Sequence, residues 1–226
     1  MNRMKQYQAG ASLMEVLIAM SISLIVTAAM IALMANSLST TARIVNMTKL
    51  ADDMRVSMQM VTRDVRRSSY NSRSMFCYGN PDCGSDGAMT LAGDITISEN
   101  NECLTFQLDR DHDGDSTENS GGGFRRVTVG DVGMMEMWTA DTAADCDVDA
   151  GWVAITDPEK MDIFNFSAVD DDADLSYTVE IYDDGTTSIS QKVRKIRLNM
   201  QGRLVLDNSI VREVEDVIAV RNDLLL

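Results

Sequence analysis

The sequence predicts an α+β protein in which one long N-terminal α-helix packs on an antiparallel β-sheet. Residues 11–35 form an apolar run of bilayer length, and neither Gly nor Pro occurs from there to Tyr78. Beyond Tyr78 the chain changes to short apolar–polar alternations separated by Gly, Asn and Asp, a pattern typical of antiparallel strands. We therefore expect four segments: a leader at 1–10, a membrane helix at 11–35, an amphipathic continuation at 36–70 and a β-rich head at 71–226.

Composition limits both the class of protein and the class of partner. The chain has 226 residues, of which 45% are apolar, and this suits one membrane anchor with one modest globular domain. The formal net charge of −15 makes nucleic acids and anionic lipid headgroups poor partners. The acidity lies mainly after residue 80, where it suits a divalent cation, a basic partner or simple solubility.

A short basic segment precedes the apolar run. It contains Arg3 and Lys5 and no acid, so it should stay on the cytoplasmic side while the long C-terminal part is exported. An ordinary secretory signal is cleaved after its apolar run. Here the small-residue junction, Gly10–Ala11, comes before the run, and cleavage there would leave the helix on the mature protein as an anchor.

Glu15 is the one charged residue in the apolar run. A carboxylate in hydrocarbon costs roughly 2.5–3.5 kcal/mol at the bilayer centre and less near its edge. Snorkelling to the interface is one solution, and pairing is the other. Cleavage after Gly10 would expose an ammonium on Ala11, four residues away, and a neighbouring subunit's amine could also reach Glu15. We hypothesise that such pairing favours a defined axial stagger between subunits.

One continuous helix is expected from Ala11 to Arg67. In its first half, Ala19, Ser23 and Thr27 recur four residues apart, which lets helix backbones approach closely. In its second half, apolar residues recur every three or four positions and define a single stripe. That stripe comprises Met47, Leu50, Met54, Met58, Val61 and Val65. A sheet should cover it, with a coiled coil as the alternative.

The head should consist of short antiparallel strands. A hairpin is indicated where Asp183-Asp184-Gly185-Thr186 separates two alternating runs. The candidate strands are Asp94–Ile97, Cys103–Leu108, Phe124–Val129, Met134–Trp138, Trp152–Ile155, Ile163–Val169, Leu175–Ile181, Ser188–Met200 and Ile210–Val220.

Four cysteines occur without a CxxC pair, and this argues against a zinc site. An even number in an exported domain indicates two disulfides. We favour Cys77–Cys83 as a small loop and Cys103–Cys146 as a long-range link, with free buried thiols as the alternative.

The segment DRDHDGDSTENSGGG, residues 109–123, predicts a calcium site. Its acids and its Gly114 match positions 1, 3, 5 and 6 of an EF-hand loop, although Ser120 replaces the Glu of position 12. The candidate ligands are Asp109, Asp111, Asp113, Asp115 and Glu118. Strands should flank the loop in place of helices, and hard oxygen ligands select Ca²⁺. A solvated acidic tip is the alternative.

An enzymatic function is not expected. The single histidine, His112, lies inside the acidic loop, so Ser-His-Asp and Cys-His arrangements lack a base. The motifs GxSxG, GxGxxG, HExxH and the P-loop do not occur. A paired-carboxylate hydrolase is the enzymatic alternative that the sequence leaves open.

The N-terminal residues resemble the signal of type IV prepilins. That signal combines a short basic leader, a Gly and an apolar helix with Glu at the fifth mature position, and the run SLMEVLIAM (residues 12–20) is similar to it. Gly10 aligns with the cleavage glycine and Glu15 with the family glutamate, whereas Ala11 stands where most members have Phe. The resemblance implies that a prepilin peptidase cuts after Gly10 and methylates the Ala11 amine.

Two further segments resemble PilW-type minor pilins: residues 50–70, LADDMRVSMQMVTRDVRRSSY, and residues 217–223, VIAVRND. This resemblance implies a type IV pilin-like fold and a minor pilin that primes pilus growth in a tip complex, in support of cell adhesion or twitching motility. The implied partners are prepilin peptidase, other minor pilins, the major pilin and a tip adhesin. The protein would sit in the inner membrane with a periplasmic head, then at the pilus tip on the cell surface.

Two alternatives stay open. A pseudopilin of a type II secretion system uses the same signal and helix. A membrane-tethered periplasmic calcium-binding or sensing module is an alternative of another class, and it would need neither processing at Gly10 nor Glu15.

Overall fold

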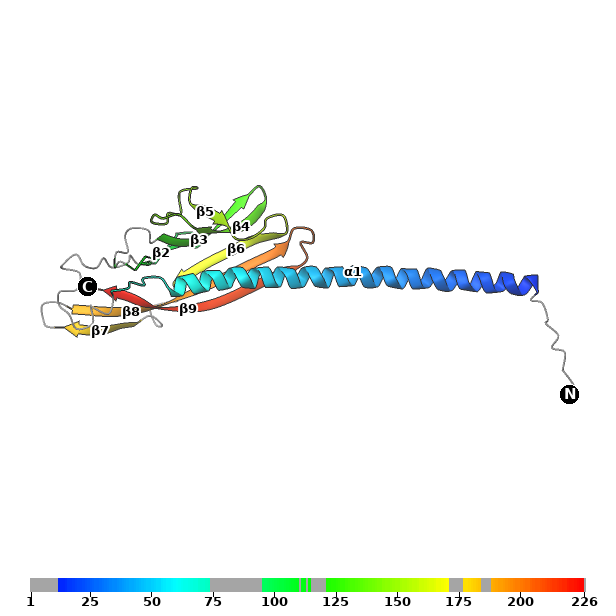
Figure 1. Ribbon diagram of the computed structural model, residues 1–226, viewed down its shortest axis with the longest axis horizontal. Helices are drawn as coiled ribbons and strands as arrows, with labels where there is room; N and C mark the ends of the chain where they lie inside the picture. Colours follow the sequence, from blue (N-terminus) through cyan, green and yellow to red (C-terminus); the bar gives the residue numbers. More distant parts are fainter. Residues whose placement is uncertain are drawn as a thin grey trace, which may run out of the picture. The chain divides into compact units, whose positions relative to one another are not determined.

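A computed structural model describes residues 12–73, 95–109, 111–112, 114, 121–170, 177–183 and 188–225. Within these ranges the chain forms one helix and nine strands (Figure 1). It divides into two compact units, Met1–Asn46 and Met47–Leu226.

The helix α1 (Leu13–Arg66) has 54 residues, and its bounds lie close to the predicted 11–67. Its first turn is closed by the Ser12 carbonyl, which accepts the backbone N–H groups of Glu15 and Val16 at 2.9 and 3.2 Å. Basic side chains occupy its last turn, where they favour the negative end of the helix dipole. Ser69, with φ of 58°, then turns the chain away from helical geometry.

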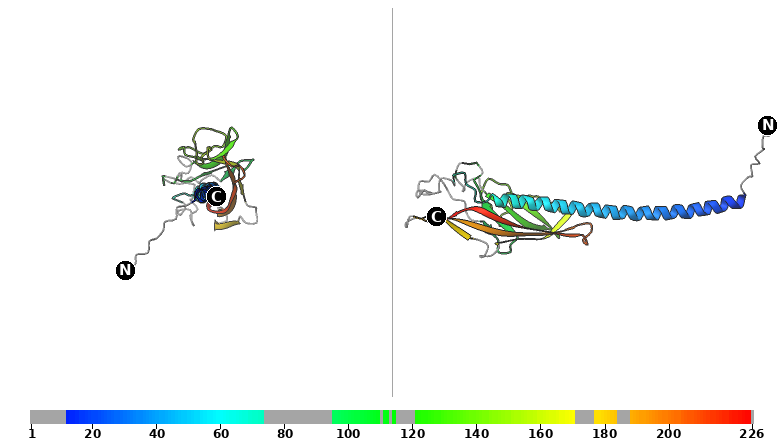
Figure 2. Two further views of the ribbon diagram at one scale, coloured as in Figure 1. Left: turned by 90° about the vertical axis from the view of Figure 1, so that its right-hand side faces the viewer. Right: turned by 90° about the horizontal axis from the view of Figure 1, so that it is seen from below.

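In the second unit α1 buries one stripe of side chains. The buried apolar members are Leu50, Met54, Met58, Val61 and Val65. Their spacing confirms the amphipathic stripe, because residues three and four apart share one face of a helix. Figure 2 shows this part of α1 running along the strands of the head.

The first sheet is an antiparallel meander of five strands in chain order. Its strands are β1 (Thr96–Ile97), β2 (Cys103–Gln107), β3 (Gly121–Val129), β4 (Val132–Trp138) and β5 (Trp152–Ala154). Gly130, with φ of 64°, begins the two-residue turn between the paired residues Val129 and Val132. Such tight hairpin turns require a positive φ, which glycine adopts without strain.

The second sheet is also antiparallel and is built around its longest strand, β8 (Ser188–Leu204). The other strands are β6 (Met161–Asp170), β7 (Tyr177–Asp183) and β9 (Val211–Leu225). Strand β9 pairs with β8 from Ser190 to Arg203, whereas β7 pairs with its beginning and β6 with its end. The β7–β8 pair confirms the predicted hairpin.

Two sheets therefore replace the single sheet that the sequence suggested, and a buried aspartate joins them. Asp162 on β6, 4% exposed, accepts the backbone N–H of Gly133 on β4 at 2.8 Å and the Nε–H of Arg203 on β8 at 2.7 Å. A Cβ on Gly133 would lie 2.0 Å from the Ile163 carbonyl oxygen, so only glycine permits this approach.

The core of the head lies between these sheets and the buried stripe of α1. It contains side chains from each layer, such as Met54 from α1, Phe124 from β3 and Ile196 from β8. On β8, Ile196, Leu198 and Met200 are fully buried while Arg197 between them is exposed, as the predicted alternation requires.

Candidate functional site

The apolar half of α1 is the first candidate site. The helix contains an 18-residue window of mean hydropathy 2.6, none of it buried, so by length and composition it can cross a membrane. Large apolar side chains are exposed along its length, from Leu13 at 77% to Met34 at 67%. The hydroxyl groups in this part of the helix are compatible with a membrane, because they are hydrogen-bonded within the helix. Ser21 and Thr27 donate to the carbonyls of Leu17 and Ser23 at 2.8 and 2.7 Å.

Glu15 lies in the first turn of α1 and is the only charged residue between Lys5 and Arg43. The predicted cleavage and methylation residues, Gly10 and Ala11, lie outside the described residues. A shallow surface groove follows the small residues predicted to favour close helix contact, and Ala19, Ser23 and Thr27 line it. This surface suits lipid or a second apolar helix.

The second candidate site is the acidic loop after β2. The structure describes Asp109 and Asp111 of its predicted ligands, whereas Asp113, Asp115 and Glu118 lie outside the described residues. Asp109 is 1% exposed and Asp111 is exposed. Among the described residues, no three His, Cys, Asp or Glu side chains gather as a metal site.

Asp109 is held mainly through one carboxylate oxygen. Its Oδ2 accepts the Ser72 hydroxyl at 2.6 Å, the Ser72 backbone N–H at 2.9 Å and the Gly114 backbone N–H at 3.1 Å. Its Oδ1 is buried and has no hydrogen-bond partner among the residues that the structure describes. Burial raises the pKa of Asp109, but hydrogen bonds from Ser72, Gly114 and His112 outweigh it and bring the pKa below its ordinary value.

The segment that leaves α1 supports this loop, which sequence reasoning did not foresee. Asn71, 3% exposed, donates its side-chain N–H to the Gly114 carbonyl at 2.8 Å. The Asp109 backbone N–H donates to the Tyr70 carbonyl at 2.8 Å. The polar run Ser68–Arg73 directly after the helix was the available signal, since Ser and Asn side chains readily bond to nearby backbone.

The sequence suggested that the three glycines at the end of the acidic segment lie in a loop before the strand. In the structure they belong to β3. Gly121, Gly122 and Gly123 pair with Gln107, Phe106 and Thr105 on β2. A Cβ on Gly122 would lie 2.3 Å from the Phe106 ring, so this strand needs a residue without a side chain there.

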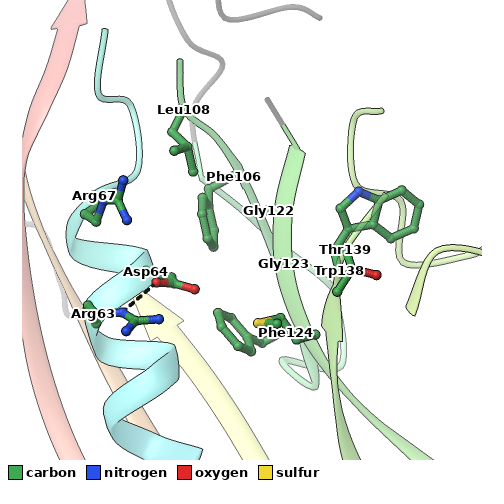
Figure 3. A pocket seen from close by; sticks show the side chains of 11 residues that line it. Arg63, Asp64, Arg67, Phe106, Leu108, Gly122, Gly123, Phe124, Trp138 and Thr139 are labelled. Carbon is green, nitrogen blue, oxygen red and sulfur yellow. Dashed lines mark hydrogen bonds and ion pairs between the residues drawn. The ribbon is translucent and has the colours of Figure 1, made fainter. Parts of the chain in front are cut away.

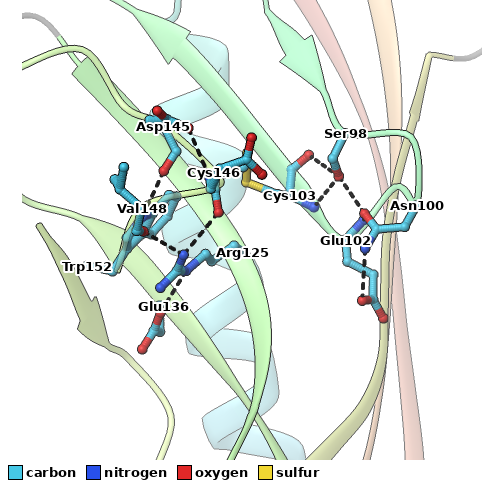
Figure 4. Close-up of a disulfide and its surroundings, with 11 residues drawn as sticks. Ser98, Asn100, Glu102, Cys103, Arg125, Glu136, Asp145, Cys146, Val148 and Trp152 are labelled. Carbon is cyan, nitrogen blue, oxygen red and sulfur yellow. Dashed lines mark hydrogen bonds and ion pairs between the residues drawn. A yellow bond between two sulfur atoms is a disulfide. The ribbon is translucent and has the colours of Figure 1, made fainter. Parts of the chain in front are cut away.

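The disulfide Cys103–Cys146 is present, with 6.2 Å between the Cα atoms. Cys77 and Cys83 lie outside the described residues. Figure 4 shows how the disulfide and Arg125 hold the loop between β4 and β5. Arg125, 7% exposed, donates to the carbonyls of Cys146 and Val148 at 3.1 and 2.8 Å and pairs with Glu136 at 2.8 Å.

His112, the only histidine of the chain, packs edge-on against the Tyr70 ring at 5.8 Å between centroids. With φ of 63°, it also occupies a turn conformation in the acidic loop. The structure thus gives His112 a place in loop packing, beside Asp109.

Comparisons with known proteins agree with the prepilin resemblance. Residues 5–31 match the prokaryotic N-terminal methylation motif, and residues 43–220 match prepilin peptidase-dependent protein B. No curated protein and no solved structure matches the chain. The motif and the apolar helix mark a type IV pilin-like protein that is anchored in the inner membrane and depends on prepilin peptidase. Because the second match spans most of the sequence, the chain belongs to the prepilin peptidase-dependent protein B family.

Proposed function

We propose that this protein is a minor pilin of the PilW type that helps to initiate type IV pilus assembly and forms part of the tip complex. The observation that carries the proposal is a lone carboxylate, Glu15, which lies in an exposed apolar helix and inside the segment that matches the methylation motif. A charge in hydrocarbon is costly and is usually retained for a function.

Assembly supplies the partner that Glu15 needs. Processing after Gly10 exposes the Ala11 amine, and a neighbouring subunit's amine then pairs with the Glu15 carboxylate. This pairing removes most of the cost of a buried charge, which is several kcal/mol when the charge is unpaired. It also fixes the axial position of one helix against the next.

The proposal includes location and partners. The mature chain waits in the inner membrane with its head in the periplasm, and then enters a tip complex with other minor pilins, the major pilin and a tip adhesin. The disulfide-linked head fits this route, since disulfides persist outside the reducing cytosol. A type II secretion pseudopilin uses the same helix, and the class of filament that contains the protein decides between the two.

Mass spectrometry of the mature protein and of sheared surface fibres tests the proposal. We expect a chain that starts at methylated Ala11 and occurs in the fibres, and a Glu15→Ala variant that is processed but largely absent from them. Ser21→Ala is the matched control, because it changes a polar side chain of the same helix without removing charge. An intact Met1, or normal fibre entry of Glu15→Ala, would refute the proposal.

We also propose that the acidic loop binds Ca²⁺. The buried Asp109 Oδ1 has no partner in the described part of the chain, and this favours a cation because an unsatisfied buried carboxylate oxygen costs free energy. Gly114, with φ of 89°, makes the sharp turn that position 6 of a calcium loop requires. Asp109 and Asp111 would hold the ion together with Asp113, Asp115 and Glu118.

Calorimetric titration of the full chain in detergent with Ca²⁺ tests this site. Asp111→Ala should reduce the heat of binding strongly, whereas Asp141→Ala, which changes an exposed acid outside the loop, should not. Equal heats from both variants would exclude the site. Calcium binding by a chain that keeps Met1 would instead favour the membrane-tethered calcium module.

A further inference from the structure

A groove of about 350 Å³ opens in the head between the end of α1 and the first sheet (Figure 3). Its volume lies near the lower limit of ~300–1,000 Å³ for binding pockets, so it suits one or two side chains. Arg63 and Arg67 project into it from one side of the helix, four residues apart. Phe106 on β2 and Phe124 on β3 face them across the groove.

The charge in the groove is basic, although the chain as a whole is strongly acidic. Arg63 Nε pairs with Asp64 Oδ1 at 3.1 Å, which neutralises one guanidinium. The Arg67 guanidinium makes no hydrogen bond or ion pair within the described part of the chain, and Arg67 is exposed. One guanidinium is thus available to an anion, in a protein whose formal net charge is −15.

The opposite wall of the groove is built on buried aromatic side chains. Phe106 and Phe124 are 3% and 0% exposed, and their stacked rings lie 6.5 Å apart. Gly122 leaves the space that the Phe106 ring fills. The rings are thus covered and offer an occupant little surface, whereas the exposed Arg67 guanidinium is open to it, and this suits a carboxylate.

We propose that the groove receives an acidic side chain from the head of another pilin-like subunit. The inference rests on the proposed assembly function and names the contact by which this head selects its neighbour. A polyanion such as nucleic acid or an anionic bilayer meets repulsion from the net charge of −15, whereas a single carboxylate meets only the local field of Arg67.

Photo-crosslinking of the full chain in cells tests the contact. A benzoylphenylalanine at Thr139, an exposed residue lining the groove, should crosslink to a second pilin-like protein within a peptide that contains Asp or Glu. Arg67→Glu should lower the yield by about tenfold or more, because it places two acids against each other. Arg66→Glu is the matched control, since Arg66 is exposed in the same helical turn but does not line the groove.

Charge reversal on the partner completes the test. Replacing the crosslinked acid by Arg should restore the yield with Arg67→Glu, and Arg67→Gln serves as a milder variant where Arg67→Glu lowers the amount of protein. Crosslinks to lipid alone, or an equal yield from Arg66→Glu and Arg67→Glu, overturn the inference. If the mature chain starts at methylated Ala11, either of these outcomes leaves the proposed function intact. An intact Met1 with an Arg67-dependent crosslink overturns the proposed function alone.

Discussion

Removal of the Cys103–Cys146 disulfide should destabilise the head by several kcal/mol. The bond links two residues 43 positions apart and encloses β2, β3 and β4. It lies in a small satellite core, where Cys103 packs with Trp138 and Trp152. The double variant Cys103→Ser/Cys146→Ser removes the link and leaves the other two cysteines untouched.

The magnitude follows from the entropy of the unfolded chain. A cross-link that closes a loop of 43 residues lowers that entropy enough to stabilise the folded state by about 4 kcal/mol at 25 °C. Whole domains are stable by about 5–15 kcal/mol, so the variant should still fold at 25 °C but lose a large part of its margin. Arg125 and its carbonyl partners keep the β4–β5 loop in place without the bond.

Tryptophan fluorescence during urea denaturation measures this effect. The chain has only two tryptophans, and both pack beside Cys103, so the signal reports this region of the head. The full chain in detergent should show a lower midpoint and an unfolding free energy reduced by about 2–4 kcal/mol. A change below about 1 kcal/mol would refute the reasoning, because it would mean that other contacts already restrict the unfolded chain.

Three other predictions concern single residues of the head. Met54→Ala, at a site with 0% exposure, should cost about 2–5 kcal/mol in thermal unfolding, whereas Met60→Ala at 36% exposure should stay within about 0.5 kcal/mol. Asp109→Asn should cost about 1.5–3 kcal/mol near pH 7 by urea denaturation, since hydrogen bonds to a charged acceptor are lost. Because the folded pKa of Asp109 is lowered, that difference should shrink as the pH falls below about 4. Arg125→Met should raise amide hydrogen exchange in the β4–β5 loop by about tenfold or more, because two carbonyls lose their donor.

Most of the fold could be predicted because its elements obey local rules. The buried stripe of α1 appeared as a spacing of three and four, and the alternation around Ile196 matched the two faces of β8. Each predicted strand overlaps an observed one, and most differ at their ends by a few residues. Turn residues such as Gly130 supplied the boundaries.

The features that escaped prediction depend on contacts between distant residues. The contact between the two sheets includes Asp162, whose partners lie 29 and 41 residues away. The three glycines of β3 looked like loop residues, because nothing near them in the sequence shows that the Phe106 ring needs that space. The arginine-lined groove likewise forms only when α1 and β3 come together in the folded head.

The two parts of α1 have different surroundings, and this explains why the helix is apolar on all faces in its first part and amphipathic in its second. From Leu50 onward only one stripe of the helix is buried, and the core of the head covers it. The remaining faces of this part of the helix are exposed to water. From Leu13 to Met34 the large side chains are exposed on every face, which water does not tolerate over such a length. That segment fits a lipid environment. Under the proposed function, Glu15 is unfavourable in lipid and becomes favourable beside a neighbouring amine, so the residue that destabilises the isolated subunit in the membrane would stabilise the assembled one.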